Sequence, residues 1–118
     1  MKFISAEEFL KQDEDVQRVF TDYFDHKEML FEDGSIYFGP FNCLYTTPLL
    51  TEGDLREFIE DKTGCYIDIS HNSMDTCIQL CDKENEYPIG EWEWQYLNND
   101  LLQVYWKAAV EIAEHETR

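Results

Sequence analysis

Aromatic residues spread along the whole length of this chain are the feature that most constrains its fold. They make up 15% of the 118 residues and extend from Phe3 to Trp106, interleaved with acidic side chains. A disordered acidic segment combines high charge with few aromatics, whereas 43% of this chain is hydrophobic, which is enough to fill a core. We therefore expect one folded domain over residues 1–118, with its charge on the surface.

The N-terminal segment carries the signature of a helix. Ser5 and Glu8 form a capping box, and an apolar stripe at helical spacing follows as far as about Asp25. The stripe skips residues 11–15. This gap leaves two interpretations open, one continuous helix or two short helices of which the second is capped by Asp13.

Two stretches of alternating apolar and polar residues each predict a β-hairpin. The paired segments are 29–31 with 35–38, and 66–70 with 76–81. The first pair flanks Asp33-Gly34, the dipeptide that best accepts a two-residue type I′ turn. Residues 41–45 are a candidate further strand before Pro48 interrupts the run.

Two more helices are predicted between and after the hairpins. Thr51 with Asp54 begins one that ends at Gly64, and Asn98 or Asn99 begins the last. The resulting order is α-ββ(β)-α-ββ-α. Because hairpins make antiparallel sheets and helices must bury their apolar stripes, we expect an α+β fold, an antiparallel sheet of two hairpins with three helices packed on it in two layers.

The charge of the chain restricts its partners. Asp and Glu number 26 against 9 Lys and Arg, a formal net charge of −17. Such a surface is repelled by nucleic acid and by anionic lipid, so a basic protein partner is favoured over direct binding to nucleic acid or membrane. The first ten residues lack the apolar region of a signal peptide, and no window reaches the length of a membrane span, so a cytoplasmic location is expected.

The four cysteines are Cys43, Cys65, Cys77 and Cys81. Disulfides lack their usual rationale without a secretory context, and Cys77-x-x-x-Cys81 is not the C-x-x-C spacing that structural zinc sites favour. A cluster with His71 is conceivable, but two cysteines two pleats apart on one strand share a metal poorly. Buried or half-buried thiols are the favoured interpretation, with no metal and no cofactor.

An acidic loop and the segment after it form the first candidate binding surface. The residues concerned are Asp82, Glu84, Glu86, Glu91, Trp92, Glu93 and Trp94. As a strand, the last four would place the tryptophans on one face and the carboxylates on the other. The tryptophan face is either core or the site of an exposed interface anchor beside acids that orient a cationic partner, and core is the favoured interpretation.

A carboxylate row on the first helix is the second candidate surface. Glu8, Asp15 and Asp22 recur every seven residues and would extend for about 20 Å along a continuous helix. The i,i+4 pairs Glu7–Lys11 and Glu14–Arg18 would neutralise part of it, so a merely solvated helix face remains an equal alternative for this helix alone.

No catalytic signature competes with these surfaces. The chain lacks G-x-S-x-G, H-E-x-x-H, a glycine-rich phosphate loop and an EF-hand, so we do not expect an enzyme. In size, charge and lack of a catalytic motif it resembles the small acidic anti-restriction and anti-CRISPR proteins of phages and mobile elements. The resemblance implies an inhibitor, acting in the cytoplasm of a host cell, that presents a DNA-like negative surface to a nuclease, restriction enzyme or CRISPR effector.

Two other functions remain open. An immunity protein that neutralises a partner toxin would also be small, acidic and rich in aromatics, because electrostatic steering gives fast capture. The second of these is an acidic housekeeping domain with no partner that recognises its charge. The sequence leaves monomer and dimer equally open.

Overall fold

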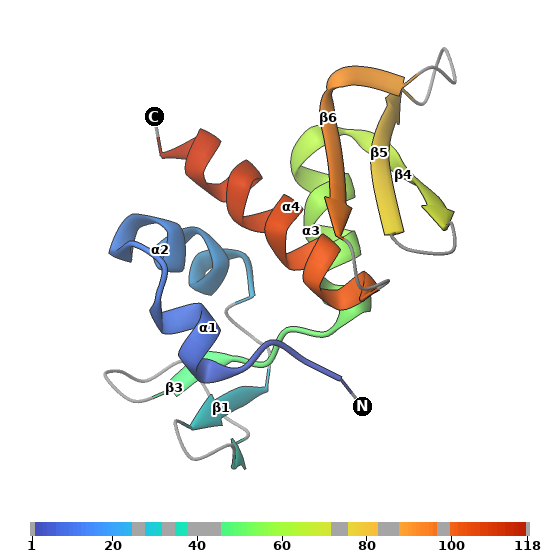
Figure 1. Ribbon diagram of the computed structural model, residues 1–118. Coiled ribbons are helices and arrows are strands. Elements are labelled where there is room, and N and C mark those ends of the chain that lie inside the picture. The colour runs from blue at the N-terminus through green and yellow to red at the C-terminus, as the bar shows by residue number, and fades with distance from the viewer. Residues whose placement is uncertain are drawn as a thin grey trace. The chain divides into compact units, whose positions relative to one another are not determined.

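The computed structural model describes residues 2–24, 28–31, 35–37, 46–71, 76–82, 88–96 and 100–117. These residues contain four helices and two three-stranded antiparallel sheets, which confirms the α+β class (Figure 1). The chain divides into two compact units, one of Met1–Thr51 with Ala113–Arg118 and one of Glu52–Ile112.

Two short helices begin the first unit, α1 (Ala6–Leu10) and α2 (Glu14–Tyr23). The Ser5 side chain accepts a hydrogen bond from the backbone N–H of Glu8 at 3.1 Å, as the capping box predicts. The interpretation with two helices is the correct one, with Asp13 at the N-cap position of α2, but the Asp13 side chain makes no capping hydrogen bond. The Phe9 and Phe20 rings, with centroids 6.1 Å apart, join the buried faces of the two helices.

The turn between α1 and α2 is held by side-chain amides. Gln17 Nε2 donates to the backbone carbonyl of Gln12 at 2.7 Å and lies 3.4 Å from that of Leu10. Gln12 Nε2 donates in turn to the carbonyl of Glu8 at 3.4 Å. Carbonyls at the end of α1 that have no helical partner are thereby satisfied, which allows the chain to change direction.

The first sheet has the order β2-β1-β3, with β1 (Met29–Phe31), β2 (Ile36–Tyr37) and β3 (Thr46–Pro48). The first predicted hairpin is confirmed, with Leu30 opposite Ile36. The two-residue turn predicted for Asp33-Gly34 falls on residues that the structure does not describe. Residues 32–34 and the candidate strand 41–45 lie outside the described residues.

The second unit begins with α3 (Glu52–Thr63), directly after Thr51 as predicted. Its inward residues Leu55, Phe58 and Ile59 are fully buried. Gly64 follows with a φ of 70°, the left-handed conformation in which glycine commonly ends a helix.

The second sheet has the order β4-β5-β6, with β4 (Cys65–His71), β5 (Thr76–Asp82) and β6 (Pro88–Tyr96). The second predicted hairpin is confirmed, with Ile67 opposite Leu80 and Ile69 opposite Ile78. The fold class stands, but its strands form two sheets instead of the single sheet expected. The reason is local, because each hairpin pairs with a third strand, β3 or β6, that follows it in the sequence.

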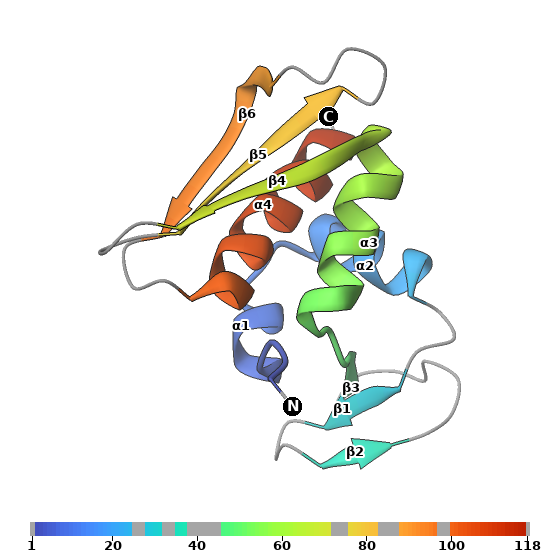
Figure 2. The ribbon, with the colours of Figure 1, turned by 90° about the vertical axis from the view of Figure 1, so that its right-hand side faces the viewer.

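The last helix, α4 (Leu101–Glu116), covers the second sheet together with α3 (Figure 2). It starts slightly later than expected: Asp100 Oδ1 accepts a hydrogen bond from the backbone N–H of Gln103 at 3.3 Å, as an N-cap does. Asn98 and Asn99 lie outside the described residues. Its predicted inward face is largely buried: Leu101 is half-buried, and the fully buried positions are Leu102, Tyr105, Ala108, Ala109 and Ile112. Ile67, Ile78 and Leu80 of the sheet are also buried and belong to the core of this unit.

Cysteine burial follows the sequence interpretation where the structure describes it. Cys65 and Cys81 are buried and Cys77 is half-buried, while Cys43 lies outside the described residues. Packing as small hydrophobic side chains therefore accounts for them.

Candidate functional site

The carboxylate row of the first helix is divided by the turn at residues 11–13. Glu8 belongs to α1, where it is half-exposed, whereas Asp15 and Asp22 are exposed residues of α2. A single straight row of about 20 Å, which needs one continuous helix, is therefore wrong. The part that remains is the seven-residue pair on α2.

Asp15 and Asp22 border the same depression of the first unit. Its volume is about 310 Å³, and Arg18, Val19 and Thr117 complete its lining. Arg18 Nη1 lies 3.9 Å from Asp15 Oδ1, with side chains 69% and 72% exposed. Ion pairs so open to solvent contribute little to stability. The depression thus offers two solvated carboxylates around one loosely held guanidinium.

Of the predicted pairs, Glu7–Lys11 is confirmed at 3.7 Å between Oε1 and Nζ. Arg18 instead approaches Asp15, three residues before it, and not Glu14. Both ion pairs are exposed, so the local reduction of negative charge on these helices is weak.

The acidic loop and the tryptophan segment are only partly described. Asp82 ends β5, and Glu84 and Glu86 lie outside the described residues. Glu91, Trp92, Glu93 and Trp94 belong to β6, so the strand interpretation of this segment is confirmed. The pairing places Trp94 opposite Ile78 and Glu93 opposite Gln79. The structure does not describe the side chains of these four residues.

A second acidic depression lies on the outer face of α3 and was not predicted. Its volume is about 480 Å³, and it is lined by Gly53, Arg56, Glu57, Glu60, Asp61 and Gly64. These residues follow i,i+4 rows along one side of the helix, with a glycine at each end of the depression. A signal existed in the sequence, because the glycines bracket two rows that carry three carboxylates and one guanidinium.

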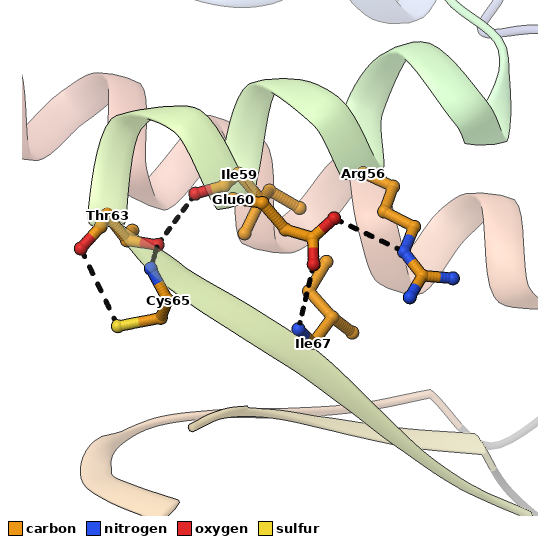
Figure 3. A network of polar contacts seen from close by, with 6 residues as sticks. All are labelled: Arg56, Ile59, Glu60, Thr63, Cys65 and Ile67. Carbon is orange, nitrogen blue, oxygen red and sulfur yellow. Dashed lines mark hydrogen bonds and ion pairs between the residues drawn. The ribbon is translucent and has the colours of Figure 1, made fainter. Parts of the chain in front are cut away.

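The cation of this depression is held by its neighbours (Figure 3). Arg56 Nε lies 3.4 Å from Glu60 Oε1, and Glu60 Oε2 accepts a hydrogen bond from the backbone N–H of Ile67 at 3.3 Å. Arg56 also hydrogen-bonds the Tyr105 hydroxyl of α4. Glu60 and Tyr105 therefore both engage Arg56, while Glu57 and Asp61 are exposed residues of the same depression.

The surroundings of the Tyr105 hydroxyl, which adjoins this cluster, change its pKa. Burial raises the pKa of its hydroxyl above the ordinary value of 10.0, and nearby Glu52 and Glu60 act in the same direction. The Arg56 guanidinium opposes them, both by its charge and by its hydrogen bond. The phenol is therefore neutral at physiological pH and serves as a buried support for Arg56.

The chemistry available on these surfaces is electrostatic attraction of cations. Across the described ranges, no group of three or more His, Cys, Asp or Glu side chains is arranged to hold a metal ion. Within the same ranges, no helix is long and apolar enough to cross a membrane. The exposed carboxylates of α2 and α3 suit the basic side chains of a protein partner.

Comparisons with known proteins give no relative from which a function can be transferred. The chain matches no protein-family model, and no curated protein or solved structure is significantly similar to it.

Proposed function

We propose that this protein inhibits a nucleic-acid-processing enzyme by occupying its phosphate-binding groove. The enzyme is a CRISPR effector, a restriction enzyme or another nuclease, and the inhibitor acts inside the host cell by binding alone. The observation that carries the proposal is the pair Asp15 and Asp22, two exposed carboxylates that border one depression on α2. The chain around them has a net charge of −17.

The spacing of this pair supports competition with nucleic acid. Seven residues of α-helix rise about 10 Å. Measured along the axis of duplex DNA, three phosphate steps of one strand also rise about 10 Å, at about 3.4 Å each. A groove whose Lys and Arg residues are spaced for phosphates can therefore engage carboxylates at similar intervals.

The α3 depression adds negative charge in the second unit. Glu57 and Asp61 are exposed there and lie one helical turn apart, about 6 Å along the axis. Because both units present carboxylates to solvent, a basic partner is attracted from a distance before any contact forms. Such steering raises association rates and weakens as salt is added.

An affinity pull-down tests the proposal. The tagged protein is incubated with host lysate at low and moderate salt, and captured proteins are identified by mass spectrometry with and without duplex DNA as competitor. We expect one nuclease or CRISPR effector that DNA displaces. Adding the protein to that purified enzyme should then inhibit its binding of DNA.

Two variants with the same change of charge make the test specific. Asp15→Asn with Asp22→Asn removes the α2 pair, and Asp68→Asn with Glu114→Gln removes two exposed carboxylates that do not line this depression. Both bring the net charge from −17 to −15. The first should lose more capture than the second. A small toxin that survives DNA competition would instead indicate an immunity protein, and abundant basic proteins that wash off with salt would indicate solvation only.

A further inference from the structure

We propose that the outer edge of β6 accepts an extended, Lys- or Arg-bearing segment of the partner as an added β-strand. The main-chain groups of Glu93 and Gln95 would form the new hydrogen bonds. This inference deepens the proposed function, on which the basic character of the partner rests, by specifying how that partner docks.

The direction of the main-chain groups follows from one hydrogen bond at the opposite edge of the sheet. The N–H of Ile67 in β4 donates to Glu60 of α3 and so points away from β5. In an antiparallel ladder, the residue directly opposite then also points its main-chain groups away. That residue is Leu80, whose N–H and C=O therefore face β6.

The main-chain groups of successive residues alternate in direction along a strand, which fixes the direction of those in β6. Ile78, two residues before Leu80, also faces β6, so it and its opposite residue Trp94 form a hydrogen-bonded pair. The N–H and C=O groups of Glu93 and Gln95 then face away from β5. No strand among the described ranges pairs with β6 on that side.

Two other parts of the edges of this sheet are less suitable for strand addition. On β4, the N–H of Cys65 donates to Thr63 Oγ1 at 3.3 Å and that of Ile67 to Glu60, so helix residues already satisfy the first half of this edge. On β6, the pairing register shifts between Gln79 and Cys81, and proline begins the strand at position 88. Regular geometry with outward donors is therefore found at residues 93–96.

Charge selects the occupant of this edge. A second copy of the chain would bring another net charge of −17, and antiparallel self-pairing centred here would place the two Glu93 residues near each other. Like charges opposite each other destabilise strand pairs, whereas opposite charges stabilise them. A partner strand that carries Lys or Arg therefore fits this edge better than a second copy does.

A peptide titration of the full ¹⁵N-labelled chain tests the inference. The probe is an eight-residue peptide in which Lys alternates with Thr or Val. Its control is the same peptide with every main-chain nitrogen methylated. The control keeps the charges but has no main-chain hydrogen-bond donors. We expect the amide signals of Glu93 and Gln95 to shift most and their hydrogen exchange to slow. The methylated peptide should bind about tenfold more weakly or worse.

Substitution of the protein gives the reciprocal test. Glu93→Pro removes one outward N–H but no ladder bond to β5, a position at which edge strands tolerate proline. We expect it to weaken peptide binding about tenfold, while Glu93→Gln, which removes only the charge, weakens it less. If Glu93→Pro does not fold, the methylated peptide still decides the question on the unmodified protein.

Three results would overturn the inference. Equal binding of both peptides would mean that charge alone attracts them, and protection of amides elsewhere would place the contact on another surface. A dimer in sedimentation that Glu93→Pro dissociates would assign the edge to a second copy. The lysate pull-down tests the proposed function separately. If it captures no nuclease but the peptide still protects the amides of Glu93 and Gln95, the nuclease target is rejected and strand addition is supported.

Discussion

The carboxylate of Glu60 accepts a hydrogen bond from the backbone N–H of Ile67 at 3.3 Å and thereby joins α3 to the edge of β4. Its other oxygen lies 3.4 Å from Arg56 Nε, so one side chain satisfies a strand edge and holds a cation. Edge strands expose unpaired main-chain groups that invite association, and natural proteins cover them in such ways.

Loss of this contact should destabilise the fold. We expect Glu60→Ala to lower the free energy of unfolding by about 1–2 kcal/mol, because the half-buried N–H of Ile67 loses a charged acceptor. Glu57→Ala, on the exposed side of the same helix, should change it by less than about 0.5 kcal/mol. Urea unfolding followed by circular dichroism measures both, and equal effects would mean that the Glu60 contact contributes nothing.

A buried hydroxyl in the first sheet offers a stabilising substitution. Thr47 is 1% exposed, and its Oγ1 has no hydrogen-bond partner among the described residues. Because Val has the same shape without the hydroxyl, Thr47→Val should leave the free energy of unfolding unchanged or raise it by about 1 kcal/mol. Thr47→Ser keeps the hydroxyl, loses a methyl group and should be destabilising. A loss of stability in Thr47→Val would reveal a partner for this oxygen.

Local signals in the sequence were sufficient for most elements. The Ser5 cap, the Gly64 terminus and both hairpins depend on residues within a few positions of one another, and all are found. The division into two sheets was not predictable, because it depends on which third strand each hairpin recruits. The turn held by Gln17 was also missed, since hydrophobic periodicity carries no information about a side-chain amide that reaches back five residues.

The candidate site was predicted to a smaller extent. Periodicity placed Asp15 and Asp22 on one face, and they do border one depression. It also placed Glu8 in the same row, because a heptad count assumes that the helix continues. The α3 depression was missed because the spacing of charges along a helix does not by itself indicate a hollow.

The raised pKa of Tyr105 predicts a stability change at alkaline pH. The folded protein holds this proton more tightly than the unfolded chain, whose tyrosine titrates at 10.0. The contribution of the protonated Tyr105 to the free energy of unfolding is therefore complete below pH 10. It is lost as pH rises from there through the pKa of Tyr105 in the folded protein. The difference in free energy of unfolding between wild type and Tyr105→Phe, measured by urea denaturation from pH 8 upward, should shrink above pH 10. A difference independent of pH would contradict the shift.

The register of β6 predicts the role of one tryptophan. Trp94 lies opposite Ile78, which is fully buried, and directly opposite residues share a face of the sheet. We therefore expect Trp94→Ala to lower the free energy of unfolding by about 3–5 kcal/mol, in the range of large core truncations. Thermal and urea unfolding measure it. A stable Trp94→Ala protein that dissociates faster from its partner would make Trp94 an interface anchor instead.

Ionic strength distinguishes a charge-reading partner from simple solvation. Once the pull-down supplies a target, its association rate with this protein should fall steeply between low and physiological salt, where the screening length is about 8 Å, while the dissociation rate changes less. Asp15→Asn with Asp22→Asn should slow association more than the matched Asp68→Asn with Glu114→Gln, because both residues of the α2 pair line one depression and neither control residue does. Stopped-flow measurements at several salt concentrations give both rates. Equal slowing by the two double variants would show that the partner responds to total charge and not to this surface.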